Sequence, residues 1–418
     1  MDIRNLPTVH SYQTDAASLP ERGDVGTWVG RAWLPADVAP DGIAGPRVVS
    51  VRGGELVSTR YATMSALIND PDCLASLATG GQSIAPLDEV FAASRFDRRA
   101  ADLRSEKRVV LLAPNDLLAT KACGVTFVRS LLERVVEEKA KGDPLKAREL
   151  RGIILETLGD DLSKVEPGSA ETDALKEKLM AAGVWSQYLE VGIGKDAEIF
   201  TKAQPMSSVG YGAQIGVLPD SAWNNPEPEV VLAVAADGSI RGATLGNDVN
   251  LRDYEGRSAL LLGEAKDQNA SCAIGPFIRL FDDSFSLADI TRLEIELTIT
   301  GPDGFTVSGC NRMSEISRPP QALVRQAIGR HHQYPDGFML FLGTMFAPTE
   351  DRGGEGKGFT HHVGDRVEIA AGPLGRLVNW VNHTDAIPPW DYGIGDLIDF
   401  LTGTSTRTTS KKKEGSVP

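Results

Sequence analysis

The sequence is poor in cysteine and in aromatic residues, and it has no long apolar run. Of its 418 residues, 4 are cysteines and 6% are aromatic. Cys73, Cys123, Cys272 and Cys310 are far apart, which excludes a CxxC metal clip and a small disulfide-bonded scaffold. No stretch approaches the roughly 18 apolar residues of a transmembrane helix, and the N-terminus has no apolar segment of signal-peptide length. We therefore expect a cytoplasmic protein with reduced cysteines and no membrane partner.

Basic side chains are outnumbered by acidic ones. The chain has 43 Lys and Arg against 57 Asp and Glu, which gives a formal net charge of -14. A nucleic-acid-binding protein needs a basic face, so we expect no nucleic-acid partner. The hydrophobic content of 41% is enough for one large domain or two ordinary ones. Because an acidic protein needs a cation to hold anionic substrates, metal ligands are the first residues to look for.

The pattern divides the chain into a β-rich N-terminal part, a helical insertion and a second β-rich part. Up to about residue 105, short apolar runs broken by Gly and Pro predict a small β-rich domain and a polar linker. From about residue 128 to 187 the apolar spacing is helical, and from about 190 to 390 strands and turns return. We predict an α+β fold whose catalytic domain, residues 106–403, is a mixed β-roll that carries the insertion. The tail, residues 404–418, is too polar to fold.

The stretch NNPEPEVVL places two carboxylates at the start of an apolar strand. Glu227 and Glu229 are two residues apart, so their side chains project from the same face of that strand. A turn at AADGS would return the chain beside it, and the next strand ends at Asp248 in LGNDVNLRD. Three oxygen ligands from two adjacent strands suit Mg²⁺ or Mn²⁺. From the spacing of the glutamates alone, two solvated acids at a strand entry are the commoner alternative.

The order of five motifs resembles the signature of the fumarylacetoacetate hydrolase superfamily. They lie within about residues 108 to 390 and are NNPEPEVVL, LGNDVNLRD, LLGEAKDQNASCAIGPF, FLGTMFAP and GFTHHVGDRVEI. Further stretches, among them FTKAQPMSSVGYG and GRHHQYPDGFMLFLGTMFAP, resemble its sugar-acid dehydratase branch, the 2-keto-3-deoxy-D-xylonate and L-arabinonate dehydratases. The resemblance implies a β-roll of the fumarylacetoacetate hydrolase type and a homo-oligomer, a dimer or tetramer. It also implies that Glu227, Glu229 and Asp248 bind Mg²⁺ or a similar ion.

The resemblance further implies which residues surround the metal-bound substrate. Lys266, in the AKD stretch, sits beside it, Arg252 lines the pocket and Thr344 lies near the substrate carboxylate. From the residues alone, Lys266 would be a surface lysine, although the small and apolar residues on both sides favour partial burial. Ser207 and Ser208, in a glycine-rich stretch, have short hydroxyls that either bind a polyol tail or serve ordinary turn chemistry.

One position departs from the hydrolases of this superfamily. Their N-terminal histidine activates water for attack on a diketone, whereas Ser130 stands in its place in GVTFVRSLLE and Glu133 is retained. No histidine occurs from residue 11 to 330, and a serine without a base is a poor water activator. The substitution therefore argues against C–C bond hydrolysis. His331 and His332 are candidates for a proton shuttle, of which a strand would turn at most one toward a site.

Metal-dependent dehydration makes demands that these residues can meet. A 2-keto-3-deoxy acid chelates the ion, which stabilises the enolate formed when a C3 proton leaves, and the 4-hydroxyl departs next. Lys266 and Glu255 are the candidates for acid and base, in either assignment. We predict a hydro-lyase of pentose catabolism that converts a 2-keto-3-deoxypentonate to 2,5-dioxopentanoate, also called α-ketoglutarate semialdehyde. The alternatives are a 2,4-diketo-3-deoxy sugar-acid hydrolase of the same fold and a catalytically silent binding protein.

Overall fold

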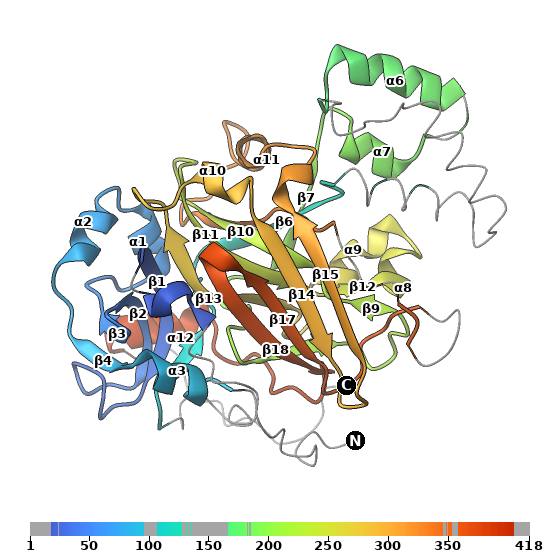
Figure 1. Cartoon of the computed structure of the whole chain (residues 1–418). Helices are drawn as coiled ribbons and strands as arrows, with labels where there is room; N and C mark the ends of the chain where they lie inside the picture. Colours follow the sequence, from blue (N-terminus) through green and yellow to red (C-terminus); the bar gives the residue numbers. More distant parts are fainter. Residues whose placement is uncertain are drawn as a thin grey trace.

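Three β-sheets carry the architecture, and short helices surround them (Figure 1). The computed structural model describes residues 18–23, 25–95, 107–127, 131, 135, 166–181, 183, 185–345, 348, 350–352 and 358–404. Much of the predicted helical insertion, Ser130 and Glu133 included, lies outside the described residues, as does the tail from residue 405 on. Within the insertion the structure describes the helix α6 (Ala170–Ala181), and α7 (Gln187–Gly192) follows at its end. Figure 1 shows both helices projecting away from the sheets.

The largest sheet has 11 strands in the order β4-β3-β2-β1-β13-β11-β10-β16-β6-β7, with β5 added beside β1. Neighbours run antiparallel except β16 and β6, which are parallel. The centre of this sheet is buried on both faces, because every residue of β10 and of β13 is buried, and this explains why both read as continuous apolar runs. Its strands are β1 (Thr27–Leu34), β2 (Gly45–Arg52), β3 (Glu55–Ser58), β4 (Ser83–Pro86), β5 (Val110–Leu112), β6 (Ala119–Gly124), β7 (Glu198–Ala203), β10 (Pro228–Val234), β11 (Ile240–Asp248), β13 (Cys272–Leu280) and β16 (Phe338–Phe341).

A five-stranded sheet packs against β10, β11 and β13 of the large one. Its order is β15-β14-β17-β18-β8, with β8 parallel to β18. The strand β14 shows why it packs this way, since Ile295, Leu297 and Ile299 are buried in the core while Glu294 and Glu296 face outward. The strands are β8 (Gln214–Val217), β14 (Glu294–Thr300), β15 (Thr306–Arg312), β17 (Arg366–Ala371) and β18 (Gly375–His383). A two-stranded sheet pairs β9 (Asn224–Asn225) with β12 (Asn250–Leu251).

The helices are mostly shorter than three turns. Besides α6 and α7, the described α-helices are α1 (Met64–Asn69), α2 (Cys73–Ala78), α3 (Leu87–Ala93), α8 (Arg252–Glu255), α9 (Leu262–Lys266), α10 (Leu287–Ile290), α11 (Pro320–Ala327) and α12 (Ile394–Thr402). Among the described residues, no helix has the length and apolar character needed to cross a membrane. The strand-rich, mixed-sheet character predicted from the sequence is confirmed.

The N-terminal strands belong to the same sheet as the central strands β10, β11 and β13. Thr27, Trp28 and Val29 of β1 pair with residues of β13, and β1 in turn pairs with β2 and β5. Residues 27–86 carry the strands β1 to β4, which share one sheet with β10 and β11. That they belong to a separate small domain stays a prediction. The predicted domain boundary near residue 105 lies within residues 96–106, which are outside the described residues, and it stays a prediction.

The hairpin of β10 and β11 has the form that the sequence predicted. Glu229 pairs with Gly246 and Pro228 with Asn247, and the chain turns between Ala235 and Ser239. The two strands therefore bring Glu227, just before β10, next to Asp248, the last residue of β11. The backbone N–H of Asp248 donates to the carbonyl of Glu227 at 3.0 Å.

Candidate metal centre

The three predicted metal ligands lie together at the open end of the β10–β11 hairpin. One side-chain oxygen from each of Glu227, Glu229 and Asp248 lies within 4.8 Å of the others. Only 4%, 1% and 1% of these residues' surfaces is exposed. Among the described residues this is the one group of at least three His, Cys, Asp or Glu side chains with such a geometry. The alternative of two solvated acids at a strand entry is therefore wrong.

The electrostatics of this group favour a bound cation. Burial, together with the charges of Asp248 and Glu227, raises the pKa of the Glu229 carboxyl well above its ordinary value. Like charges that share a buried space repel, and either a proton or a cation must relieve that repulsion. Carboxylate oxygens from neighbouring strands are ligands that hard divalent cations prefer. The residues present therefore fit a divalent ion such as Mg²⁺.

Lys266 lies against two of the three carboxylates. It is the last residue of α9 and only 3% exposed, and its Nζ lies 2.5 Å from Glu227 Oε2 and 3.0 Å from Asp248 Oδ2. The reading of Lys266 as a surface lysine is thus wrong. Burial alone would lower the pKa of Lys266, but the nearby carboxylates, Asp248 and Glu227 foremost, outweigh burial and raise this pKa above its ordinary value. The side chain stays an ammonium ion.

A second buried lysine, which the sequence reasoning missed, lies on the other side of Asp248. Lys202, on β7, is 0% exposed, and its Nζ is 3.0 Å from Asp248 Oδ1. Asp248 therefore lies between two ammonium groups, one at each carboxylate oxygen. The sequence offered one signal for a second lysine, which was charge balance. Three buried acidic side chains and one predicted lysine leave a site with a net negative charge.

A small cavity of about 20 Å³ adjoins the carboxylates. It has room for an ion or a water molecule and is smaller than a five-carbon sugar acid. Of the predicted residues outside the metal ligands, Lys266, Glu255 and Thr344 line it. Glu198 and Phe200, which the sequence reasoning missed, also line it, from the same face of β7 because they are two residues apart. The complete lining is Cys123, Gly124, Val125, Glu198, Phe200, Glu227, Glu229, Asp248, Glu255, Lys266 and Thr344.

Asn250 holds Glu255 next to the metal ligands. Its Nδ2 donates to Glu227 Oε1 at 2.9 Å and to Glu255 Oε2 at 2.7 Å. Glu255 reaches this place as the last residue of the helix α8. Asp253 instead accepts hydrogen bonds from the Ser221 hydroxyl and the Ala222 N–H, both at 2.8 Å.

Thr344 is positioned by a buried asparagine that also contacts the ligand strand. Asn311, on β15, donates through Nδ2 to Thr344 Oγ1 and to the carbonyl of Pro228, both at 2.7 Å. The backbone N–H of Gly343 donates to Glu229 Oε2 at 2.6 Å. The turn after β16 therefore contributes both a cavity residue and a hydrogen bond to a ligand.

Three predicted substrate-binding residues lie outside the lining of this cavity. The guanidinium of Arg252 stacks over the Trp223 ring at 4.9 Å. Ser207 and Ser208 line a different cavity of about 570 Å³, whose walls also include Trp390. The Ser207 hydroxyl donates to the Gln204 carbonyl at 2.8 Å, which is the turn chemistry left open as an alternative. No described residue lines both cavities.

The histidines considered for proton transfer do not line the carboxylate cavity either. His331 and His332 are exposed, and the His332 ring packs on Tyr334 with centroids 4.6 Å apart. The described lining of the cavity contains no histidine.

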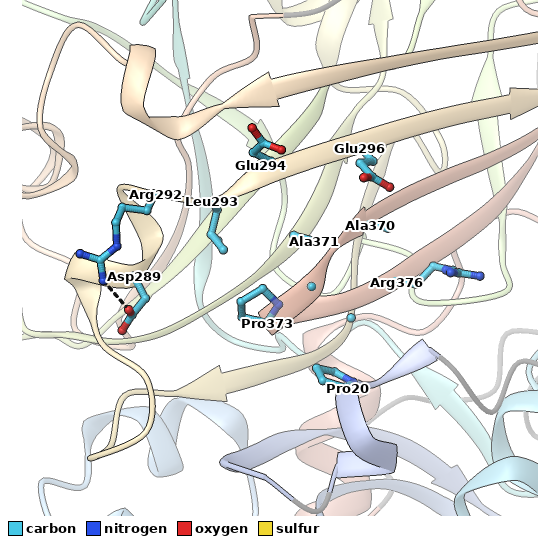
Figure 2. A pocket seen from close by; sticks show the side chains of 12 residues that line it. Pro20, Asp289, Arg292, Leu293, Glu294, Glu296, Ala370, Ala371, Pro373 and Arg376 are labelled. Atoms are coloured by element: carbon cyan, nitrogen blue, oxygen red, sulfur yellow. Dashed lines mark hydrogen bonds and ion pairs between the residues drawn. The ribbon is translucent and has the colours of Figure 1, made fainter.

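A third cavity, of about 620 Å³, opens at the outer face of the five-stranded sheet. Figure 2 shows Glu294 and Glu296 projecting from β14, with Asp289 paired to Arg292 at 2.7 Å beside them. None of its lining residues belongs to the carboxylate cavity, and none of its charged side chains is buried. The volume of a cavity therefore does not identify the candidate metal centre in this molecule.

Comparison with known proteins points to one family. Residues 187–382 match the family described as the fumarylacetoacetate (FAA) hydrolase C-terminal domain. A probable 2-keto-3-deoxyxylonate dehydratase of Haloferax volcanii is 34% identical over 194 residues, which are 46% of this chain and 63% of that protein. A 2-dehydro-3-deoxy-D-arabinonate dehydratase of Saccharolobus solfataricus is 33% identical over 181 residues, 43% of this chain and 57% of that protein. The matched region is thus shorter than two thirds of either relative.

Solved structures extend the likeness to most of the chain. The apo form of a 2-keto-3-deoxy-D-arabinonate dehydratase superimposes with a TM-score of 0.57 at 21% identity, over 85% of this chain and 99% of that one. A 2-keto-3-deoxy-D-arabinonate dehydratase complexed with magnesium and 2,5-dioxopentanoate gives the same TM-score and identity. At this identity the likeness concerns the fold, which matches the expected fumarylacetoacetate hydrolase type. Residues 187–382 are therefore similar to the C-terminal domain of the fumarylacetoacetate hydrolase family.

Proposed function

We propose that this protein is a Mg²⁺-dependent hydro-lyase that converts a 2-keto-3-deoxypentonate to 2,5-dioxopentanoate. The observation that carries the proposal is the buried group of Glu227, Glu229 and Asp248 with the Lys266 ammonium against two of them. The relatives named above support the substrate class, because they are dehydratases of such acids. One related structure holds magnesium and 2,5-dioxopentanoate.

Glu227, Glu229 and Asp248 would hold the ion, and Mn²⁺ would serve in place of Mg²⁺. When bound, the ion supplies the positive charge that polarises a 2-keto acid and makes its C3 protons more acidic. Asn250 and Gly343 keep two of the carboxylates oriented, because they donate hydrogen bonds to Glu227 and Glu229. The chain thus presents the ligands before the ion arrives.

The charge states of the nearby groups suggest their roles. The Lys266 ammonium lies against Glu227 and Asp248 at the edge of the cavity, so it is suited to stabilise negative charge on the substrate rather than to abstract a proton. Glu255 lines the cavity and is held by Asn250, which makes it the better candidate to take the C3 proton. The proton would pass to the departing 4-hydroxyl, which leaves as water and gives a C3=C4 enone. Loss of a C5 proton and protonation at C3 would convert this enone to the C4=C5 enol, and protonation at C4 would then give the C5 aldehyde. Glu198 is a second carboxyl in the lining available for this transfer.

The experiment that tests the proposal detects the aldehyde product. Purified protein and Mg²⁺ are incubated with racemic 2-keto-3-deoxypentonate, and an NAD(P)-dependent semialdehyde dehydrogenase reports the product through absorbance of the reduced nicotinamide. We expect a signal that requires both protein and metal and is abolished by EDTA. Separate C4 epimers and the six-carbon homologue then define stereochemistry and chain length.

The second candidate function is hydrolysis of a 2,4-diketo-3-deoxy sugar acid. It would release two acids and no aldehyde, so the same assay with product analysis separates the two reactions. The absence of a histidine from the described lining of the cavity favours the dehydratase.

Self-association and cellular context are part of the proposal. The resemblance suggests a homo-oligomer, and the exposed face of α12, with Ile394, Ile398 and Leu401, is an apolar surface that a subunit contact would cover. Light scattering coupled to size-exclusion chromatography tests the assembly. A cytoplasmic location and a role in pentose catabolism are tested by cell fractionation and by growth of a deletion strain on pentoses.

A further inference from the structure

Lys202 is a fully buried ammonium whose nearest partners are all oxygen atoms. Its Nζ lies 3.0 Å from Asp248 Oδ1, 3.2 Å from the carbonyl of Val249 and 3.4 Å from the Ser271 hydroxyl, and it also donates to the carbonyl of Lys266. Burying a lysine without a partner for its charge is strongly unfavourable, so this set of oxygens is what makes the position possible. A side chain that only filled space would need none of them.

We propose that Lys202 is a positioning residue of the metal centre, which fixes both the carboxylate of Asp248 and the backbone of Lys266. The inference rests on the proposed metal-binding function of Glu227, Glu229 and Asp248. Lys202 contacts neither the cavity nor the expected place of the substrate, since it is absent from the cavity lining. It acts through its neighbours.

The first of these neighbours is Asp248, whose two oxygens face different lysines. Lys266 Nζ lies 3.0 Å from Oδ2 and Lys202 Nζ lies 3.0 Å from Oδ1. A carboxylate held at both oxygens cannot rotate about its Cβ–Cγ bond without losing one ion pair. Lys202 therefore restrains the plane of the Asp248 carboxylate. That plane sets the direction in which the remaining lone pairs of its oxygens point.

The second neighbour is the C-terminal end of α9. The carbonyl of Lys266 accepts a hydrogen bond from Lys202 Nζ and another from the Ser271 hydroxyl at 2.8 Å. The last carbonyls of a helix have no partner within the helix, and a cation placed there is favourable. Lys202 thus anchors the backbone of the same residue whose Nζ reaches Glu227 and Asp248.

The place of β7 in the sheet shows which parts of the fold the Lys202 side chain connects. β7 is the last strand of the large sheet, and β10, β16 and β6 separate it from β11, which ends at Asp248. The Lys202 side chain therefore connects the sheet edge to the ligand strand by a route other than the strand ladder, while β7 also contacts α9. Lys202 thus links three elements, β7, β11 and α9, whose relative positions the site requires.

The test compares Lys202→Met with Lys121→Met. Methionine keeps the length and volume of the lysine stem and removes its charge. Lys121 is the matched control, because it lies on the neighbouring strand β6 and its Nζ donates to the Thr201 hydroxyl at 2.9 Å without touching a metal ligand. Each protein is stripped with EDTA and loaded with Mn²⁺, and the electron paramagnetic resonance spectrum of the bound ion is recorded.

We expect the zero-field splitting of bound Mn²⁺ to change in Lys202→Met and to stay that of the parent protein in Lys121→Met. At saturating Mg²⁺ and substrate, we expect kcat to fall at least tenfold only in Lys202→Met. A parent spectrum and parent kcat in Lys202→Met, with a lower melting temperature alone, would show that Lys202 is merely structural. If the protein bound Mn²⁺ but had no dehydratase activity, the proposed reaction would fail while the spectra still decided the role of Lys202.

A second variant covers the case in which Lys202→Met does not fold. Ser271→Ala keeps both lysine charges and removes the hydroxyl that contacts Lys202 Nζ and the Lys266 carbonyl. We expect a smaller change of the Mn²⁺ spectrum in the same direction and a loss of kcat of about threefold. An unchanged spectrum and kcat in this variant would overturn the proposal.

Discussion

Gly343 donates its backbone N–H to Oε2 of Glu229 at 2.6 Å, so the turn that follows β16 holds one of the proposed metal ligands. Gly343 has φ of +90°, a conformation that side chains rarely adopt. A Cβ at this position would lie 2.0 Å from Thr126 Oγ1. The hydrogen bond to Glu229 therefore depends on a residue without a side chain.

Gly343→Ala should lower both stability and metal affinity. Backbone strain and the clash with Thr126 should cost about 2 kcal/mol or more of unfolding free energy. A shifted turn would also withdraw the N–H from Glu229, so Mg²⁺ binding measured by calorimetry should weaken. The control is Gly304→Ala, at φ of +83° with no atom within 4 Å of the new Cβ, where about 1 kcal/mol is expected. Equal losses in the two variants would contradict the role of the close contact.

Glu229→Gln should abolish tight Mg²⁺ or Mn²⁺ binding while the protein remains folded. The change is nearly isosteric, and the amide oxygen can still accept the hydrogen bond from Gly343, but the negative charge is lost. Calorimetric titration of the EDTA-treated protein measures the affinity, and circular dichroism checks the fold. Glu296→Gln, on the exposed face of β14, is the matched control with the same chemical change. An ion still tightly bound in Glu229→Gln would refute the ligand assignment.

Lys266→Met should reduce turnover by a factor of about 10² to 10⁴, the range typical of a lost catalytic group. Loss of the ammonium also leaves Glu227 and Asp248 without one partner, so the metal-free variant should melt at a lower temperature. Added Mg²⁺ should recover much of that stability without restoring the rate. Turnover near that of the parent protein, at saturating metal, would remove Lys266 from the catalytic group.

Asp365 should make stability depend on pH below about 4. Burial would raise its pKa, but hydrogen bonds from His361 and Arg352 lower the pKa from the ordinary 3.8 to about 2. Because the folded pKa is lower than the unfolded one, Asp365 stabilises the fold above pH 4, and this contribution is lost as the pH falls toward 2. Its size is about 2 kcal/mol.

The measurement for Asp365 is urea denaturation from pH 2 to 6 for the parent protein and Asp365→Asn. The other carboxyl groups titrate in both proteins, so the difference between the two curves isolates this residue. The parent protein should be more stable at pH 6, and the difference should shrink as the pH approaches 2. A difference that stays constant across this range would show that the hydrogen bonds with Arg352 and His361 do not lower the pKa of Asp365.

The clustering of the three carboxylates could be predicted because its signal is local. Glu227 and Glu229 share a strand face by their spacing, and the turn at AADGS fixes the register that brings Asp248 beside them. Burial could not be deduced in the same way, since the same spacing fits two solvated acids. The resemblance of the ordered motifs, rather than periodicity, decided between these readings.

The residues that surround the ligands could not be predicted because their contacts join strands far apart in the sequence. Strand alternation tells which face Glu198 or Lys202 occupies, but not which strand lies opposite. Asn311 reaches Pro228 across 83 positions of sequence. The helix at Arg252–Glu255 was missed for a related reason: four residues are too few to show helical periodicity, and tertiary contacts decide their conformation.

Because β1 pairs with β13, the sheet that carries the site includes strands that lie outside the region of sequence similarity. The family match begins at residue 187, which leaves out β1 and β6, the partners of β13 and β16. A fragment cut at that point would expose unpaired backbone groups along two strands that are buried in the intact sheet, and such edges recruit other chains. The strands β1 and β6 therefore cover two edges of the site-bearing part of the sheet, although neither strand supplies a proposed metal ligand.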